Sequence, residues 1–222
     1  MSKKGVSGKK LLLVLLTVLL LAVIPGVLVP TLVCRDTEVK LPDLGKVDDF
    51  ALVDETGNPF TQEALRGHPT IVDFIFTRCD TICPIISMKM QRLQDKLLDR
   101  KADSIKILSI TVDPTNDTPE KLAAYAAKFH AKPDKWRFVT GDPEKVKALV
   151  EGPFMNSMMQ EGFTKSGAPQ ISHNGYFILV DGDLTIRGIY DSNDVKKLDE
   201  LQHHARYLAR TGSGRSYKFG GG

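Results

Sequence analysis

The chain has 222 residues, of which 42% are hydrophobic and 26% are charged, so we expect one globular domain with a real core and room for a tether. The net charge is +3, and Lys3, Lys4, Lys9 and Lys10 crowd the first ten residues. The remainder is therefore near neutral, which excludes the electrostatic footprint of a nucleic-acid-binding protein. The three cysteines are too few for a disulfide-stapled scaffold.

The N-terminal region predicts a membrane anchor. Residues 1–10 are basic, and the run from Leu11 to Val33 is apolar and uncharged. At ~1.5 Å per residue this run is long enough to cross the ~30 Å hydrocarbon core of a bilayer as one transmembrane helix. Lysines precede the run, so the positive-inside tendency places residues 1–10 in the cytoplasm and the large domain outside. We therefore expect a single-pass protein of the cell inner membrane with a periplasmic domain.

Two other interpretations of this region stay open. A cleaved signal peptide would have a shorter apolar region and a small-x-small cleavage site, whereas Ala22 is the only alanine of the run. A lipoprotein would use Cys34, but Thr31, Leu32 and Val33 lack the small residue expected before a lipidated cysteine. The lack of an Arg-rich leader favours a bacterial membrane over a mitochondrial one. All three interpretations place the domain in an oxidising compartment.

Beyond a linker at 34–46, strands and helices alternate through a domain at 47–210, and a Gly/Ser tail follows at 211–222. We predict, in chain order, a hairpin at 50–60, a strand at 70–77, a helix from Pro84 along which Ile85, Met88, Leu93 and Leu97 recur, a strand at 105–112, a helix at 118–129, a strand at 136–140, a helix at 142–150, a hairpin at 175–190 and a helix at 193–210. This order predicts an α/β fold: a thioredoxin-like sheet flanked by helices and preceded by one N-terminal transmembrane helix.

The cysteines Cys79 and Cys83 lie between a predicted strand and a predicted helix, and Pro84 follows the second one. The strand ends of an open α/β sheet are where such folds present reactive groups. A helix N-terminus also lowers thiol pKa values and favours thiolate, the form that attacks disulfides and binds metals. The pair therefore predicts either a metal site or a redox site.

Three residues separate the two cysteines, one more than in a thioredoxin-type dithiol. Residues four apart on a helical turn have Cβ atoms about 5–6 Å apart, close enough to share one metal ion or to approach further as a disulfide. Structural zinc usually takes four protein ligands, and the chain has no second cysteine pair. Two thiolates with one imidazole suit copper better, because sulfur favours Cu(I) and imidazole tolerates Cu(II).

Of the five histidines, His173 has the most suggestive position, since it precedes the predicted hairpin that runs beside the dithiol in a thioredoxin-like fold. Position alone leaves open whether it is a ligand or an ordinary loop histidine. The others have simpler interpretations: turn, helix end or solvent-facing helix residue for His68, His130, His203 and His204.

The sequence Cys79-Asp80-Thr81-Ile82-Cys83-Pro84, the stretches Thr111–Pro114 and Asp117–Glu120, and the distal histidine together resemble the Sco/SenC family. The likeness spans roughly Val47 to Leu208. It implies a thioredoxin-like copper protein that helps to assemble the dinuclear copper centre of cytochrome c oxidase. It also implies copper ligands at Cys79, Cys83 and His173.

The resemblance also names partners, namely the copper-bearing oxidase subunit or another copper chaperone. One position departs from the family pattern: an acidic residue commonly precedes the histidine, and this chain has Ser172. Asp113 and Asp117 follow the second predicted strand, and either proximity to the site or turn formation and helix capping would explain them.

Four functions compete for the cysteine pair. A copper metallochaperone would need His173, whereas a thiol–disulfide oxidoreductase that keeps partner cysteines reduced would not. A peroxidase of the peroxiredoxin type would need a Pro-x-x-x-Thr-x-x-Cys pattern, and no proline stands between Thr70 and Cys79. A purely stabilising disulfide would close a very short loop and gain little entropy.

Overall fold

The computed structural model describes residues 39–97, 104–154 and 175–211, together with residues 9, 12, 13 and 17–19. The chain divides into a short N-terminal unit, 1–38, and a larger unit from Val39 onward. Among the described residues, no helix combines the length and apolar character needed to span a membrane. The apolar run 11–33 lies mostly outside those residues, as do Cys34 and the tail from 212 onward.

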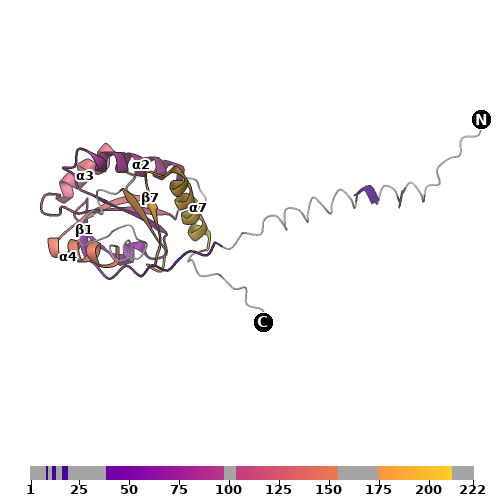
Figure 1. Cartoon of the computed structure of the whole chain (residues 1–222), viewed down its shortest axis with the longest axis horizontal. Coiled ribbons are helices and arrows are strands. Elements are labelled where there is room, and N and C mark those ends of the chain that lie inside the picture. The colour runs from indigo at the N-terminus through magenta and orange to yellow at the C-terminus, as the bar shows by residue number, and fades with distance from the viewer. Residues whose placement is uncertain are drawn as a thin grey trace, which may run out of the picture. The chain divides into compact units, whose positions relative to one another are not determined.

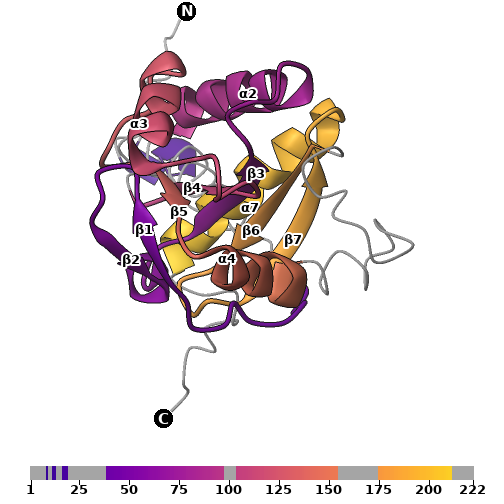
Figure 2. The same cartoon turned by 90° about the vertical axis from the view of Figure 1, so that its left-hand side faces the viewer.

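The larger unit is built on a mixed sheet whose strands follow the order β2-β1-β5-β4-β3-β6-β7, which Figure 2 shows from one edge to the other. The strands are β1 (Ala51–Asp54), β2 (Pro59–Thr61), β3 (Thr70–Ile75), β4 (Lys106–Thr111), β5 (Trp136–Thr140), β6 (Tyr176–Val180) and β7 (Ile186–Asp191). β3, β4 and β5 are parallel, whereas β1 and β6 pair with them in the antiparallel sense. The three parallel strands therefore end at one common edge of the sheet.

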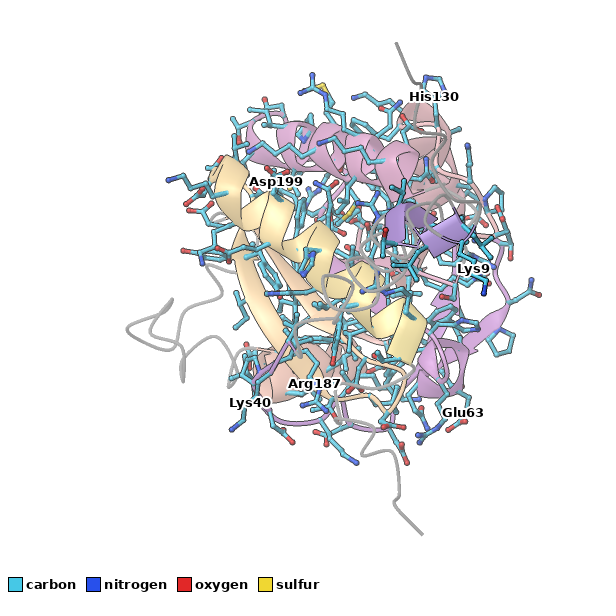
Figure 3. All side chains as sticks on the ribbon, turned by 90° about the vertical axis from the view of Figure 1, so that its right-hand side faces the viewer. Lys9, Lys40, Glu63, His130, Arg187 and Asp199 are labelled. Carbon is cyan, nitrogen blue, oxygen red and sulfur yellow. The ribbon has the colours of Figure 1, made fainter. Side chains whose placement is uncertain are left out.

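The helices cover both faces of the sheet (Figure 1). They are α2 (Ile82–Leu97), α3 (Pro119–Lys128), α4 (Pro143–Leu149) and α7 (Val195–Thr211), with short turns η1 (Gln62–Leu65) and η3 (Val150–Phe154). Side chains alternate along β3: Ile71 and Ile75 pack under α2, α3 and α7, while Val72 and Phe74 pack on α4 and η3. Figure 3 shows α7 beside α2 on the first face. The predicted α/β, thioredoxin-like class is confirmed.

The predicted start of α2 is wrong, and its predicted apolar repeat is confirmed at Leu93 and Leu97 but wrong at Ile85 and Met88. The helix begins at Ile82, two residues before Pro84, and thereby includes Cys83. Proline is tolerated there because the first N–H groups of a helix have no intrahelical partner. Ile85 and Met88 are 44% and 46% exposed, while the core side chains of α2 are Ile86, Met90, Leu93 and Leu97.

The segment that we expected to act as a linker packs on the domain over its last residues. Leu41 and Leu44 are buried, and Lys46 forms a β-bridge with Thr185. Leu44 also donates its backbone N–H to the carbonyl of Ile186. The packed region therefore extends on the N-terminal side of Val47, the residue at which we placed the start of the domain.

Candidate metal centre

Cys79 and Cys83 lie together at the edge where the parallel strands end. Cys79 is in the segment between β3 and α2, and Cys83 is in the first turn of α2. Both thiols are free and buried, with exposed fractions of 8% for Cys79 and 0% for Cys83. The backbone N–H of Cys83 donates to Cys79 Sγ over 3.4 Å. The structure therefore brings the two sequence-predicted sulfur residues into one site.

The two thiols differ in pKa because their surroundings differ. Burial opposes ionisation of Cys79, but hydrogen bonds from the Cys83 N–H and from Thr81 outweigh it and lower the Cys79 pKa to about 7. At Cys83 burial dominates and raises the pKa to about 12, despite a hydrogen bond with the backbone of Phe76. At pH 7 about half of Cys79 is therefore thiolate, whereas Cys83 stays protonated. We therefore expect Cys79 to be the first of the two sulfurs to bind a metal ion or to attack a disulfide.

A buried acid, Asp73, lies on the same face of β3 as the core beneath α2. One oxygen of its carboxyl accepts a hydrogen bond of 2.5 Å from Ser109, and the hydroxyl of Ser109 in turn accepts from Trp136 Nε1 at 2.8 Å. Its other oxygen, Oδ2, is buried without a partner. Burial raises the pKa of Asp73 to about 7, only partly opposed by Ser109. The side chain is therefore largely protonated in mildly acidic solution.

Asp73 should make the stability of the domain depend on pH. The folded chain holds this proton with a pKa of about 7 against the ordinary 3.8, so the folded state binds more protons between those values. The contribution of Asp73 to the free energy of unfolding is then greatest below pH 4 and falls as the pH rises to 7. At ~1.4 kcal/mol per pH unit the total loss is about 4 kcal/mol. In urea unfolding between pH 4 and 8, Asp73→Asn should remove this slope. The exposed-site control Asp142→Asn should keep it, and parallel curves for wild type and Asp73→Asn would contradict the assignment.

The segment before Cys79 is fastened to the loop that follows β4. Asp117, which is fully buried, accepts hydrogen bonds from the Thr77 backbone N–H at 3.1 Å, from Thr77 Oγ1 at 2.5 Å and from Thr111 Oγ1 at 2.5 Å. Arg78 forms an ion pair with Asp113 at 2.6 Å, with most of the arginine side chain in solvent. Proximity to the segment that carries Cys79 is thus supported for both aspartates, and turn formation is also confirmed for Asp113, whose carbonyl accepts from the Asn116 and Asp117 N–H groups. Helix capping falls instead to Thr118, whose hydroxyl accepts from Lys121 N.

The third predicted ligand, His173, lies outside the described residues. The other four histidines are on other parts of the domain: His68 precedes β3, His130 follows α3, and His203 and His204 are on α7. His204 Nδ1 is hydrogen-bonded to the hydroxyl of Tyr190 at 2.8 Å. Among the described residues no group of three or more His, Cys, Asp or Glu side chains could hold a metal ion. The described part of the site therefore consists of two thiols.

Gly175 connects the stretch that contains His173 to this edge of the sheet. It immediately precedes β6, whose Ile178 pairs with Val72 of β3 in the antiparallel sense, so β6 starts at the edge where β3 ends. Gly175 has φ of +66°, and a Cβ at this position would lie 3.5 Å from Ile86 Cδ1 and 2.9 Å from Ser192 Oγ. Glycine is therefore needed for the backbone conformation and for close approach to Ser192, and the same position contacts Ile86 of α2, three residues beyond Cys83.

Three members of the buried hydrogen-bond networks described above were missed from sequence, namely Asp73, Thr77 and Ser109. Asp73 did carry a signal, because an acid in the otherwise apolar run TIVDFIFT is unusual for a buried strand. Thr77 and Ser109 carried none, since threonine and serine are common at strand ends and within strands. Their partners are 40 and 36 residues away in the chain, and only the folded sheet brings them together.

Comparison with known proteins gives consistent relatives. The SCO1 protein homolog of Bacillus subtilis is 30% identical over 177 residues, which cover 76% of this chain and 85% of that protein. The solved structure of BsSco, a member of the Sco family of cytochrome c oxidase assembly proteins in which a disulfide switch was identified, aligns with a TM-score of 0.64 at 27% identity. This alignment covers 77% of this chain and 96% of BsSco.

Yeast Sco1 with copper bound aligns with a TM-score of 0.56 at 25% identity, over 74% of this chain and 94% of the yeast structure. The family model SCO1/SenC matches residues 41–209, which include both cysteines, the buried aspartates and nearly the whole described domain. With that match and the Bacillus relative in agreement, the chain belongs to the SCO1/SenC family.

Proposed function

We propose that this protein is a copper metallochaperone that holds one copper ion through the thiolates of Cys79 and Cys83 and the imidazole of His173. The observation that carries the proposal is a pair of free thiols at the strand–helix junction of a SCO1/SenC domain. The backbone N–H of Cys83 donates directly to the sulfur of Cys79. The copper-bound structure of yeast Sco1 supports the choice of metal.

The donor set fits copper as cargo. Two sulfur donors select a soft ion such as Cu(I), and the described residues offer too few ligands for a closed four-coordinate zinc site. Each thiol gives up its proton when it binds the metal, so Cys79, with its pKa near 7, binds at little cost and Cys83 must be deprotonated by the ion itself. A site with few ligands also suits transfer, since a partner thiolate can bind the ion before the donor releases it.

His173 is a reasonable third ligand on grounds of chain connectivity. It stands two residues before Gly175, and two residues span at most about 7 Å. Gly175 itself lies against Ile86 of α2, one turn after Cys83. We therefore propose that an imidazole carried on so short a tether reaches the two sulfurs.

The receiving protein in this proposal is the copper-bearing subunit of cytochrome c oxidase, or another copper chaperone that serves it. The description of BsSco as a cytochrome c oxidase assembly protein supports this choice. Residues 11–33 anchor the chain in the inner membrane, and the domain from Val39 works on the periplasmic side, as the basic residues before the run favour.

Copper titration of the full-length chain under anaerobic conditions tests the proposal. One Cu(I) per chain is expected for the wild type, and His173→Ala should bind about 10–100-fold more weakly, because losing even an outer partner of a metal site costs that much. The control His203→Ala removes an exposed histidine on α7 and should bind like the wild type. Equal affinity for wild type and His173→Ala would remove His173 from the site.

A second function, thiol–disulfide exchange with a partner, is favoured by the unequal thiols and by the disulfide switch of BsSco. Cys79 thiolate would attack a partner disulfide and release one partner thiolate, and Cys83 would then resolve the mixed disulfide as the Cys79–Cys83 disulfide forms. Two electrons and the Cys83 proton would pass to the partner, whose second thiolate takes its proton from solvent. His173→Ala should leave this reduction intact. A variant that reduces a partner disulfide at the wild-type rate yet binds no copper would favour the redox role.

A further inference from the structure

We infer that Asp117 is a positioning residue for Cys79: its buried carboxylate fixes the backbone just before this cysteine and so holds the sulfur at the amino end of α2. The inference rests on the proposed function only in taking Cys79 as a working thiol, and it applies equally to copper binding and to disulfide exchange.

The segment from Phe76 to Thr81 lies outside the regular hydrogen bonding of both the sheet and the helix. It lies between the last residue of β3 and the first residue of α2, so neither the sheet ladder nor helical hydrogen bonds order it. Local contacts of this segment include a turn from the Cys79 N–H to the carbonyl of Phe76 at 3.2 Å and a contact between Cys79 Sγ and Thr81 Oγ1 at 3.5 Å. The Phe76 backbone also forms a hydrogen bond with Cys83. The Arg78–Asp113 pair adds little, because the arginine side chain is 62% exposed and such pairs are worth at most about 1 kcal/mol.

Asp117 differs from these contacts in burial and in the number of its donors. It is 0% exposed, and both of its oxygens are used by donors from two separate segments. Thr77 contributes its backbone N–H and its hydroxyl, while Thr111, at the end of β4, contributes a second hydroxyl. Hydrogen bonds to a buried carboxylate are stronger than neutral ones, and leaving any of these donors unpaired costs the full desolvation of that group. The carboxylate therefore ties the Cys79 segment to the rigid end of β4.

The consequence for the site concerns the geometry of the sulfur. Cys79 stands two residues after Thr77, and its Sγ accepts a hydrogen bond from the Cys83 N–H at 3.4 Å. This bond depends on the backbone conformation of the segment between β3 and α2. This hydrogen bond stabilises the reduced, unlinked sulfur. Loosening the segment should thus destabilise the dithiol relative to the disulfide, and should also leave the position of Cys79 Sγ less fixed for binding a metal.

Two variants make a matched pair, since Thr77→Val and Thr111→Val each remove one hydroxyl that lies 2.5 Å from the same carboxylate. The full-length chain is equilibrated in thiol–disulfide buffers without copper, and the Cys79–Cys83 equilibrium is read by trapping and mass spectrometry. We expect Asp117→Asn to shift it at least tenfold toward the disulfide, a potential lower by about 30 mV. Thr77→Val should shift it in the same direction by a smaller amount. Thr111→Val should shift it by less than twofold, because the Asp117 N–H still donates to the Asp113 carbonyl and both bonds to Thr77 remain.

A merely structural role predicts a different pattern. The control Asp181→Asn perturbs another fully buried carboxylate, which accepts from Thr185 N and Arg187 Nε beyond the far end of β6. It should lower stability and leave the potential unchanged. Equal shifts for Thr77→Val and Thr111→Val, or a shift for Asp181→Asn as large as that for Asp117→Asn, would overturn the inference. If Asp117→Asn fails to fold, the comparison of Thr77→Val with Thr111→Val tests the inference by itself. The measurement contains no copper, so its result stands even if the copper proposal fails.

Discussion

Replacement of either cysteine by serine should lower Cu(I) affinity by about a thousandfold. Structural metal sites with four ligands gain ~10–16 kcal/mol, which is up to about 4 kcal/mol per ligand, and the soft thiolate is the stronger donor to Cu(I). Cys79→Ser and Cys83→Ser should therefore both lose stoichiometric binding in competition with a chelator of known affinity. The expected loss exceeds that for His173→Ala, because imidazole is the less favoured donor for the reduced ion.

Cys34→Ser is the natural control, because it removes the third thiol of the chain and should bind copper like the wild type. Cys83 is fully buried in the first turn of α2, so circular dichroism should accompany the titration to establish that Cys83→Ser is folded. If both serine variants retain one tightly bound copper ion, the copper site lies elsewhere and the proposed function is wrong.

Cys79 should react with iodoacetamide at pH 7 at least ~100-fold faster than Cys83. With pKa values of about 7 and about 12, half of Cys79 but only ~10⁻⁵ of Cys83 is thiolate. The more basic sulfur is intrinsically more nucleophilic by ~2–2.5 decades over this interval, which offsets part of the difference. The complete burial of Cys83 then acts in the same direction as the thiolate fraction.

The measurement is a time course of alkylation of the reduced, metal-free chain, followed residue by residue with peptide mass spectrometry. The rate for Cys79 should rise with pH and reach half its maximum near pH 7. In urea the hydrogen bonds and the burial are lost, and both cysteines should then react at similar rates. Equal rates in the folded chain would contradict the difference in pKa between the two thiols.

Much of the fold follows from local sequence signals. The run TIVDFIFT is β-branched and aromatic enough to predict β3, and Thr118 with Pro119 and Asp142 with Pro143 predict the starts of α3 and α4, which the structure confirms. These signals act within a few residues, so they can be recognised without knowledge of the rest of the chain. The boundaries of strands and helices were less accurate, because helix ends depend on partners outside the element.

The buried face of α2 could not be read correctly from its own sequence. Ile85 and Ile86 are adjacent and equally apolar, so two helical stripes were possible, one through Ile85 and Met88 and one through Ile86 and Met90. The sheet decides between them, since Ile71 and Ile75 of β3 provide the apolar surface that receives the second stripe.

The cysteine pair at the junction of a strand and a helix was determined by the sequence alone, because spacing, Pro84 and the apolar run before it are local features. What only the tertiary structure decided is how the two sulfurs differ. Burial depends on packing of α2 against the sheet, and the course of the Cys79 segment depends on Asp117, a residue 40 positions from Thr77. Both are long-range effects, and so the difference between a Cys79 that ionises near pH 7 and a Cys83 that stays protonated exists only in the folded chain.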